Sequence, residues 1–170
     1  MDANELKALQ RPLKDSYRES AEKAFVTLKT TATLDSTNVS CSVQTGRALV
    51  EAGLHPATGG DGTLACSGDM LLEALAACAG VTMRSVAVNR GIELRSGTLS
   101  VEGDLDFRGT LGIERDAPVG FREIRLRFDL DSDASETELD QLLETTERYC
   151  VVLQSLLSAP AIAVTRSETN

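Results

Sequence analysis

The apolar positions of the chain concentrate in one stretch, Ser67 to Asn89, which reads SGDMLLEALAACAGVTMRSVAVN. Leu, Ala and Met dominate its interior, and these residues favour a helix. Ser67 or Asp69 suits the first turn as a cap, because a carboxylate there meets the positive end of the helix dipole. Arg90 followed by Gly91 is typical of a helix end. The pattern therefore predicts a central helix over residues 67–89.

A cysteine stands in the middle of this predicted helix. At about 100° per residue, Cys78 shares its face with small and apolar residues, whereas Glu73 and Arg84 fall elsewhere. The face comprises Leu71, Ala74, Leu75, Val81, Thr82 and Ser85. We expect Cys78 to point inward. A buried thiol is by default an inert small hydrophobic group, and reactivity requires a positive, partly open setting.

Apolar and polar residues alternate on both sides of the helix and predict strands. Residues 24–34 and 39–44 form a hairpin in this interpretation, with a turn at 35–38. Residues 92–94 and 98–107 follow the helix, and residues 121–130 form the clearest strand. Its inward side chains are expected to be Phe121, Ile124, Leu126, Phe128 and Leu130.

The last third of the chain predicts further helices. Ser135 and Glu138 have the spacing of a capping box for a helix from Glu136 to Tyr149, and Cys150 continues its apolar stripe. Residues 150–158 either prolong this helix or begin another, and residues 161–165 are expected to be a last short strand. Antiparallel hairpins set apart from helices argue for an α+β fold. We divide the chain into an N-terminal helical extension, residues 1–23 with a break at Pro12, and a single domain, residues 24–170.

Charge and composition exclude several classes of partner. The formal charge of −9 disfavours binding to nucleic acid or to an anionic membrane surface. The chain starts without the pattern of a signal peptide. Charged residues at 69, 73 and 84 interrupt the apolar helix, so we do not expect it to span a membrane. These features predict a cytoplasmic protein.

Cysteines occur at positions 41, 66, 78 and 150. In a cytoplasmic protein such thiols are free or form a redox pair. No C-x-x-C pair is present, and the one histidine, His55, lies in a Gly/Pro-rich loop, so we expect no metal site. Neither phosphate-binding glycine motif occurs, and we expect no cofactor.

Two segments carry a resemblance to a known family. The block GDMLLEALAACAGVTM, with Cys78, and the later RYCVVLQSL, with Cys150, resemble the two cysteine segments of the OsmC/Ohr family (osmotically inducible and organic-hydroperoxide-resistance proteins). The similarity covers most of residues 24–166. It implies an OsmC-like α+β fold in which antiparallel sheets wrap around central helices in an intertwined homodimer.

The resemblance also implies a function, a thiol peroxidase acting on organic hydroperoxides and recycled by a dithiol reductant. Cys78 would be the peroxidatic cysteine, Cys150 the resolving one, and Arg47 the cation that favours the thiolate and orients the peroxide. The family glutamate at the start of the cysteine helix is absent here, and Asp69 is the nearest acidic match. Leu71, Leu75 and Leu153 would form an apolar pocket that favours alkyl peroxides.

Two other interpretations remain open. The first is an OsmC-like protein that binds a small hydrophobic ligand without peroxidase turnover, which the missing glutamate favours. The second is a purely structural dimer whose cysteines are core residues. Two inward cysteines on two helices, together with Arg47, favour the peroxidase.

Overall fold

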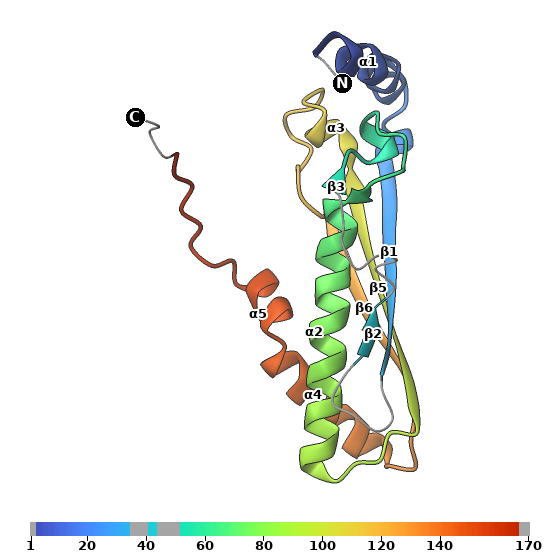
Figure 1. Cartoon of the computed structure of the whole chain (residues 1–170), viewed down its shortest axis with the longest axis vertical. Coiled ribbons are helices and arrows are strands. Elements are labelled where there is room, and N and C mark those ends of the chain that lie inside the picture. The colour runs from blue at the N-terminus through green and yellow to red at the C-terminus, as the bar shows by residue number, and fades with distance from the viewer. Residues whose placement is uncertain (1–2, 35–40, 44–51, 167–170) are drawn as a thin grey trace.

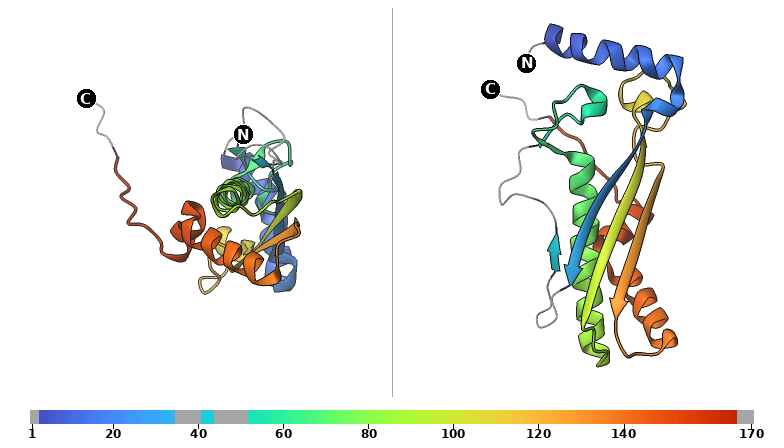
Figure 2. Two further views of the ribbon diagram at one scale, coloured as in Figure 1. Left: turned by 90° about the horizontal axis from the view of Figure 1, so that it is seen from below. Right: turned by 90° about the vertical axis from the view of Figure 1, so that its right-hand side faces the viewer.

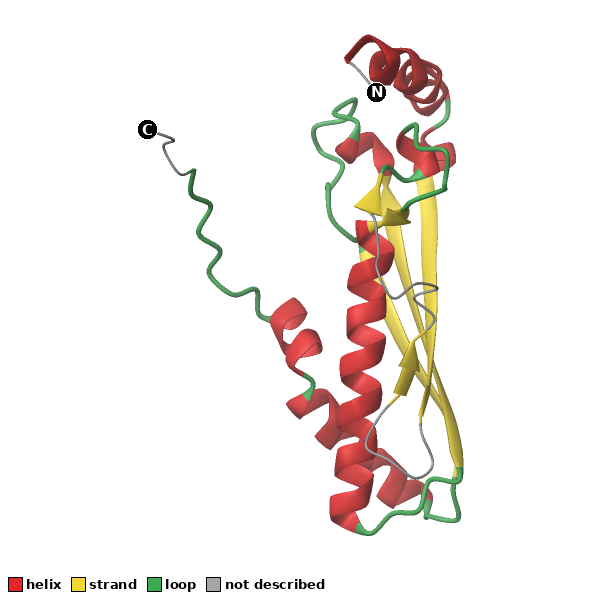
Figure 3. Cartoon of the chain, viewed as in Figure 1, coloured by secondary structure: helices red, strands yellow, loops and turns green. Residues whose placement is uncertain are grey.

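The computed structural model describes residues 3–34, 41–43 and 52–166. Helices, strands and two 3-10 turns (η) alternate along the chain (Figures 1 and 3). In chain order they are α1 (Ala3–Glu19), η1 (Ala21–Ala24), β1 (Phe25–Leu34), β2 (Cys41–Val43), β3 (Ala52–Gly53), η2 (Pro56–Thr58), β4 (Ala65–Cys66), α2 (Ser67–Arg90), β5 (Ser96–Asp106), α3 (Phe107–Thr110), β6 (Glu123–Asp131), α4 (Glu136–Tyr149) and α5 (Val151–Leu157).

An antiparallel sheet of strand order β2-β1-β5-β6 forms one layer of the molecule. The register pairs Leu99 of β5 with Phe128 of β6, which places apolar side chains of both strands on one face. The long helix α2 runs along this face, and α4 and α5 lie beside it (Figure 2). The opposite face is polar, and there Arg125 forms an ion pair with Asp104 at 2.5 Å. The mixed helical and antiparallel arrangement confirms the predicted α+β class.

The core lies between α2 and the sheet. Fully buried side chains of α2 pack with Leu99 and Val101 of β5 and with Leu142 of α4. Those of α2 are Leu72, Leu75, Ala76, Ala79, Met83 and Ala87. Burying a Leu or Met side chain contributes about 1.5–3 kcal/mol, so this face of α2 is the main source of stability. At Gly103 of β5 an added Cβ would lie 2.5 Å from the Phe121 ring, which explains the glycine there.

The structure confirms the span predicted for α2, but the buried face of this helix is not the Cys78 face that we expected. Cys78 is only half-buried, and its neighbours Leu71 and Val81 are 37% and 40% exposed. Arg84, expected away from the core, is buried and donates to the Leu94 carbonyl at 3.4 Å. The helix is apolar on nearly every side, so periodicity could not distinguish the face that meets the sheet from the face left open.

The ends of the helices were predicted more accurately than their faces. Gly91 ends α2 in the left-handed conformation with φ 70°, and Ser135 with Glu138 forms the predicted capping box at the start of α4. Cys66, without a side-chain cap bond, takes the capping position that was expected at Ser67 or Asp69.

Three further local expectations were wrong or unconfirmed. Helix α1 continues through Pro12 without a break. Residues 92–94 form no strand, because the chain there turns from α2 into β5. Residues 161–165 are extended and exposed, but they pair with no strand of the described chain (Figure 1). The division into 1–23 and 24–170 stays a prediction.

Within the described ranges, α2 is long and apolar enough to cross a membrane by length and composition. Of its apolar window, 44% is buried against the sheet and the other helices. Core packing therefore accounts for one face of this helix, and apolar side chains remain exposed on the other.

Candidate cysteine pair

Cys150 lies at the break between α4 and α5. Its N–H donates to the Thr146 carbonyl at 2.9 Å and closes α4, and its own carbonyl accepts from Gln154 N at 2.9 Å and opens α5. The side chain is fully buried. The break turns the Cys150 thiol into the protein, toward the middle of α2.

The structure brings Cys78 and Cys150 together. Burial raises the pKa of the Cys150 thiol to about 11, and a hydrogen bond with the Cys78 side chain acts in the same direction. The backbone N–H groups of Leu153 and Val152 lower this pKa, each by less than burial raises it. Both thiols are free. Cys78 of α2 and Cys150 at the junction of α4 and α5 are thus neighbouring thiols.

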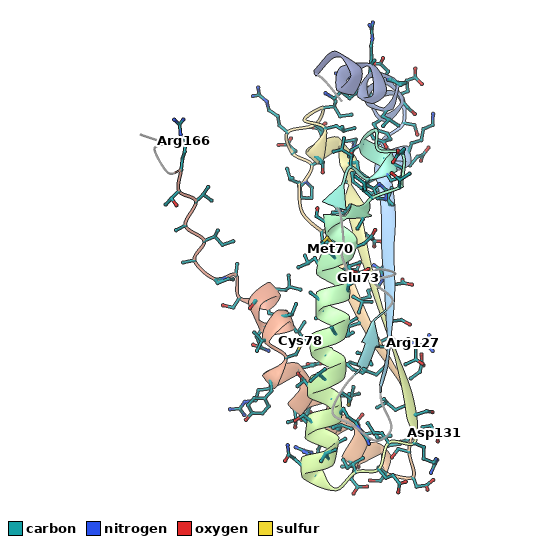
Figure 4. All side chains as sticks on the ribbon, in the orientation of Figure 1. Met70, Glu73, Cys78, Arg127, Asp131 and Arg166 are labelled. Carbon is teal, nitrogen blue, oxygen red and sulfur yellow. The ribbon has the colours of Figure 1, made fainter. Side chains whose placement is uncertain are left out.

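The two thiols differ in access to solvent. Cys78 lies midway along α2, where α5 runs beside the helix (Figure 4), and it is half-buried. Cys150 has no exposed surface and a raised pKa, so at neutral pH it is a protonated thiol. The more accessible Cys78 is therefore the better candidate for attack on an incoming molecule.

An apolar groove lies next to the pair, between α2, α5 and β6. Its volume is about 460 Å³. Its walls include Leu71, Leu75 and Leu153, as predicted, together with side chains of β6 and the loop before it. Those side chains are Phe121, Arg122, Glu123, Ile124 and Leu126. A second hollow of about 370 Å³ shares Leu126, Leu153 and Leu157 with it and extends it toward α4.

Leu75 lies about one helical turn before Cys78, and Leu153 about one turn after Cys150. The groove thus lies near the thiols, and neither cysteine is among its lining residues.

Arg122 is a wall residue that the sequence did not single out. Its guanidinium lies over the ring of Phe25, 4.7 Å from the ring centre, at one end of the groove. Only the fold places Phe121 and Arg122 beside β1 and α2. No local sequence signal marks that approach.

Asp69 lies apart from the cysteines. It is nine residues before Cys78 on the same helix, about 13 Å along the axis at 1.5 Å per residue. Burial raises the pKa of the Asp69 carboxyl, and the charge of His55 lowers it. Within one chain Asp69 is thus a neighbour of His55, not of the thiols.

Arg47 lies outside the described residues, so its predicted contact with the thiols stays a prediction. In the part of the chain that the structure describes, no group of three or more His, Cys, Asp or Glu side chains could hold a metal. The described portion of the site is therefore a pair of thiols beside an apolar groove.

Comparison with known proteins identifies the family. The family model described as OsmC-like protein matches residues 60–165, which include both cysteines of the pair. The chain therefore belongs to the OsmC-like family, which includes thiol peroxidases.

A solved structure supports the same fold. It is the crystal structure of OsmC like protein from Mycoplasma pneumoniae, with a TM-score of 0.56 and 20% sequence identity over 76% of this chain and 86% of that chain. At this identity the likeness shows the fold alone. No curated protein sequence gives a significant match.

Proposed function

We propose that this protein is a thiol-dependent peroxidase that reduces organic hydroperoxides. The observation that carries the proposal is that two free thiols, Cys78 on α2 and Cys150 between α4 and α5, are neighbours beside an apolar groove. Family membership supports it, because the family includes thiol peroxidases.

The first step takes place at Cys78. Its thiolate attacks the outer oxygen of ROOH, so that an S–O bond forms and the O–O bond breaks. The leaving alkoxide takes up a proton and departs as the alcohol, ROH. Cys78 is then a sulfenic acid, oxidised by two electrons, and the peroxide is reduced by two.

The second step uses the buried thiol. The Cys150 sulfur attacks the sulfur of the Cys78 sulfenic acid, an S–S bond forms, and the hydroxyl leaves with the Cys150 proton as water. A cellular dithiol reduces this disulfide by two thiol exchanges and becomes a disulfide itself. The burial of Cys150 suits this role, because the thiol is kept from external oxidants and beside its one reaction partner.

The groove supports an organic rather than an inorganic peroxide. Its walls are mainly Leu, Ile and Phe side chains, which favour alkyl groups through burial of apolar surface. Hydrogen peroxide gains nothing from such walls. We therefore infer that the substrates carry an alkyl chain or a ring next to the peroxide group.

We further propose that the protein acts as a homodimer. The face of α2 that carries Cys78 is small, apolar and partly exposed from Met70 to Val88. The extended C-terminal residues add Ile162 and Val164, 81% and 92% exposed. The described residues of one chain leave this surface partly exposed, and a second copy would offer a cover of matching chemistry.

The dimer also bears on Asp69 and Arg47, the two other predicted catalytic residues. Since Asp69 lies about 13 Å from Cys78 along α2, it reaches a thiol only in a second copy packed along this face. We propose that Asp69 orients Arg47, whose guanidinium favours the Cys78 thiolate and the developing alkoxide. The protein would then serve in cytoplasmic defence against oxidative stress.

The test is peroxide consumption by the reduced protein with a dithiol, using an alkyl hydroperoxide and hydrogen peroxide in parallel. Cys78→Ser should abolish turnover. Cys150→Ser should allow one reduction and then stop at the sulfenic acid. Cys66→Ser, a free and half-buried cysteine outside the pair, is the matched control and should keep full activity.

The competing function is storage or transport of a small hydrophobic ligand in the groove. The separation of Asp69 from Cys78 within one chain favours it, because the thiolate then lacks its predicted charge network. A wild type that binds an alkyl probe, consumes neither peroxide and keeps both thiols free would establish this alternative and reject the peroxidase.

A further inference from the structure

His55, the one histidine of the chain, lies where an N-terminal helix, a loop and the start of α2 meet. Its ring stacks on the Phe107 ring of α3, with 4.9 Å between ring centres and 12° between planes. It is half-buried beside Asp69 of α2. The cysteine chemistry proposed above does not use this residue.

One nitrogen of His55 holds the loop in place. The N–H of Ala57 donates to Nδ1 at 3.0 Å and caps the turn η2. Nδ1 must therefore keep its lone pair, and the proton of the neutral ring belongs on Nε2. When the ring takes up a second proton, Nδ1 becomes a donor that faces another donor, and the capping bond is lost.

The same loop residue anchors the N-terminal helix. The Tyr17 hydroxyl of α1 donates to the Ala57 carbonyl at 2.8 Å, and Tyr17 is itself buried. Ala57 thus uses its N–H for His55 and its C=O for α1.

Three further bonds tie the loop to the His55 carbonyl, from Thr58 N at 2.8 Å, from Thr58 Oγ1 at 2.9 Å and from Gly60 N at 3.2 Å. Gly60 packs so closely that an added Cβ would overlap the Leu54 carbonyl. Such a loop cannot adjust to a changed His55 without moving Ala57.

We propose that His55 is a proton-operated latch that holds the N-terminal helix on the domain when neutral and releases it when protonated. The device couples one titratable group to the docking of a 17-residue helix. It belongs to the fold and does not depend on peroxidase activity.

Burial and the charged groups around His55 determine whether docking of α1 weakens or strengthens as the pH falls. Helix α2 contributes Asp69, whose carboxylate raises the pKa of His55, while burial, the larger effect, lowers it. Helix α3 contributes the neutral Phe107 ring, and its Arg108 is bound to Asp106. Helix α1 contributes the Tyr17 phenol, which burial keeps neutral by raising its pKa.

The docked state therefore prefers the neutral imidazole. Undocking leaves His55 with an ordinary pKa near 6.5, so docking weakens as the pH falls below that value, by at most about tenfold per pH unit.

Because the chain has one histidine, its imidazole signal can be followed by NMR without assignment ambiguity. We would titrate the full-length protein from pH 8 to pH 5 and measure exchange protection of the Ala57 amide and of the α1 amides near Tyr17. Protection, corrected for the intrinsic pH dependence of exchange, should fall in step with the imidazole titration. The amides of β5 should keep their protection over the same range.

Two variants separate the latch from general acid unfolding. His55→Asn keeps a side-chain acceptor two residues before the Ala57 N–H but does not titrate, so α1 should stay docked across the whole range. Asp69→Asn removes the anion that stabilises His55⁺ in the docked state, so the loss of α1 protection at low pH should be larger than in the wild type.

Unchanged α1 protection through the imidazole titration would overturn the proposal. An equal loss of protection in His55→Asn would overturn it as well. If His55→Asn does not fold, Tyr17→Phe decides the matter. It removes the α1 anchor at every pH, so the pH dependence of α1 protection must shrink if the latch acts through Ala57.

Discussion

At the scale of single residues, burial separates groups of the same chemical type. Cys78 and Cys150 are neighbouring thiols, yet Cys150 is fully buried and Cys78 is partly open. Likewise Asp106 is 2% exposed and forms an ion pair with Arg108, whereas the ion pair of Asp129 with Arg127 is exposed to solvent. These differences predict measurable differences in reactivity and stability.

The first prediction concerns thiol alkylation. With iodoacetamide near pH 8, Cys150 should react about 100-fold more slowly than a thiol of ordinary pKa, because a pKa near 11 leaves about 100-fold less thiolate. Cys78 should be labelled first. Peptide mass spectrometry over time measures both rates, and unfolding in urea should make them equal. Faster labelling of Cys150 in the folded protein would contradict the assignment of roles.

The second prediction concerns Asp106. Its carboxylate accepts bonds from the Arg108 side chain and backbone, which lower its pKa. Asp106→Asn should reduce the free energy of unfolding by about 2 kcal/mol in urea titrations at pH 7, since a buried charged bond is lost. Asp129→Asn, at an exposed pair, should cost less than about 1 kcal/mol.

The lowered pKa of Asp106 also determines how its contribution to the free energy of unfolding changes with pH. Folding holds Asp106 in its charged form, so its contribution is complete above the ordinary pKa of about 4 and is lost as the pH falls further. The stability difference between wild type and Asp106→Asn should therefore shrink below about pH 4. A difference that stays constant down to pH 2 would show that Asp106 acts through packing alone.

At the scale of elements, local signals set where helices begin and end. In the capping box of α4, Ser135 Oγ accepts from the N–H of Glu138, and the Glu138 carboxylate accepts from Ser135 N at 2.8 Å. Satisfying two unpaired donors at a helix start is worth about 1 kcal/mol.

The third prediction follows from this cap. Ser135→Ala should lower the free energy of unfolding by about 1 kcal/mol, measured by urea titration, with no change in the slope. Thr137→Ala, two residues on and exposed within the first turn, is the matched control and should change stability by less than about 0.5 kcal/mol. Equal losses of stability in the two variants would contradict a stabilising role of the Ser135 cap.

Local signals of this kind explain which parts of the fold were predictable from sequence. The limits of α2 and α4 follow from glycine, charge and capping residues, and β6 follows from strict alternation. The orientation of α2 cannot be predicted from such signals, because leucines and alanines occur on all sides of the helix. Only packing decides which of them contact the sheet. The partnership of Cys78 with Cys150 came from resemblance, whereas the proximity of Asp69 to His55 depends on a loop that no local pattern places.

At the scale of the whole molecule, one face of the protein exposes apolar side chains to solvent. The sheet carries ion pairs on its outer face, and the core fills the space between sheet and α2. The far side of α2 instead has a stripe of small and apolar side chains. Helix α5 packs next to α2, and the extended residues after it run outward from the body (Figure 2). Monomeric proteins rarely leave so continuous an apolar surface in water.

The last prediction is that this stripe is the dimer interface. Light scattering coupled to size exclusion should give twice the chain mass of 18.1 kDa. Val81→Glu places a carboxylate on the stripe, one turn from Cys78, where burial without a partner is costly, and should shift the protein to the monomer.

Val119→Glu makes the same chemical change at an exposed loop position outside α2 and should leave the dimer intact. If Asp69 serves a thiol of the second copy, the Val81→Glu monomer should also lose most of its peroxidase turnover while keeping both thiols free. A wild type of single-chain mass would reject the dimer and, with it, any role of Asp69 in the cysteine chemistry.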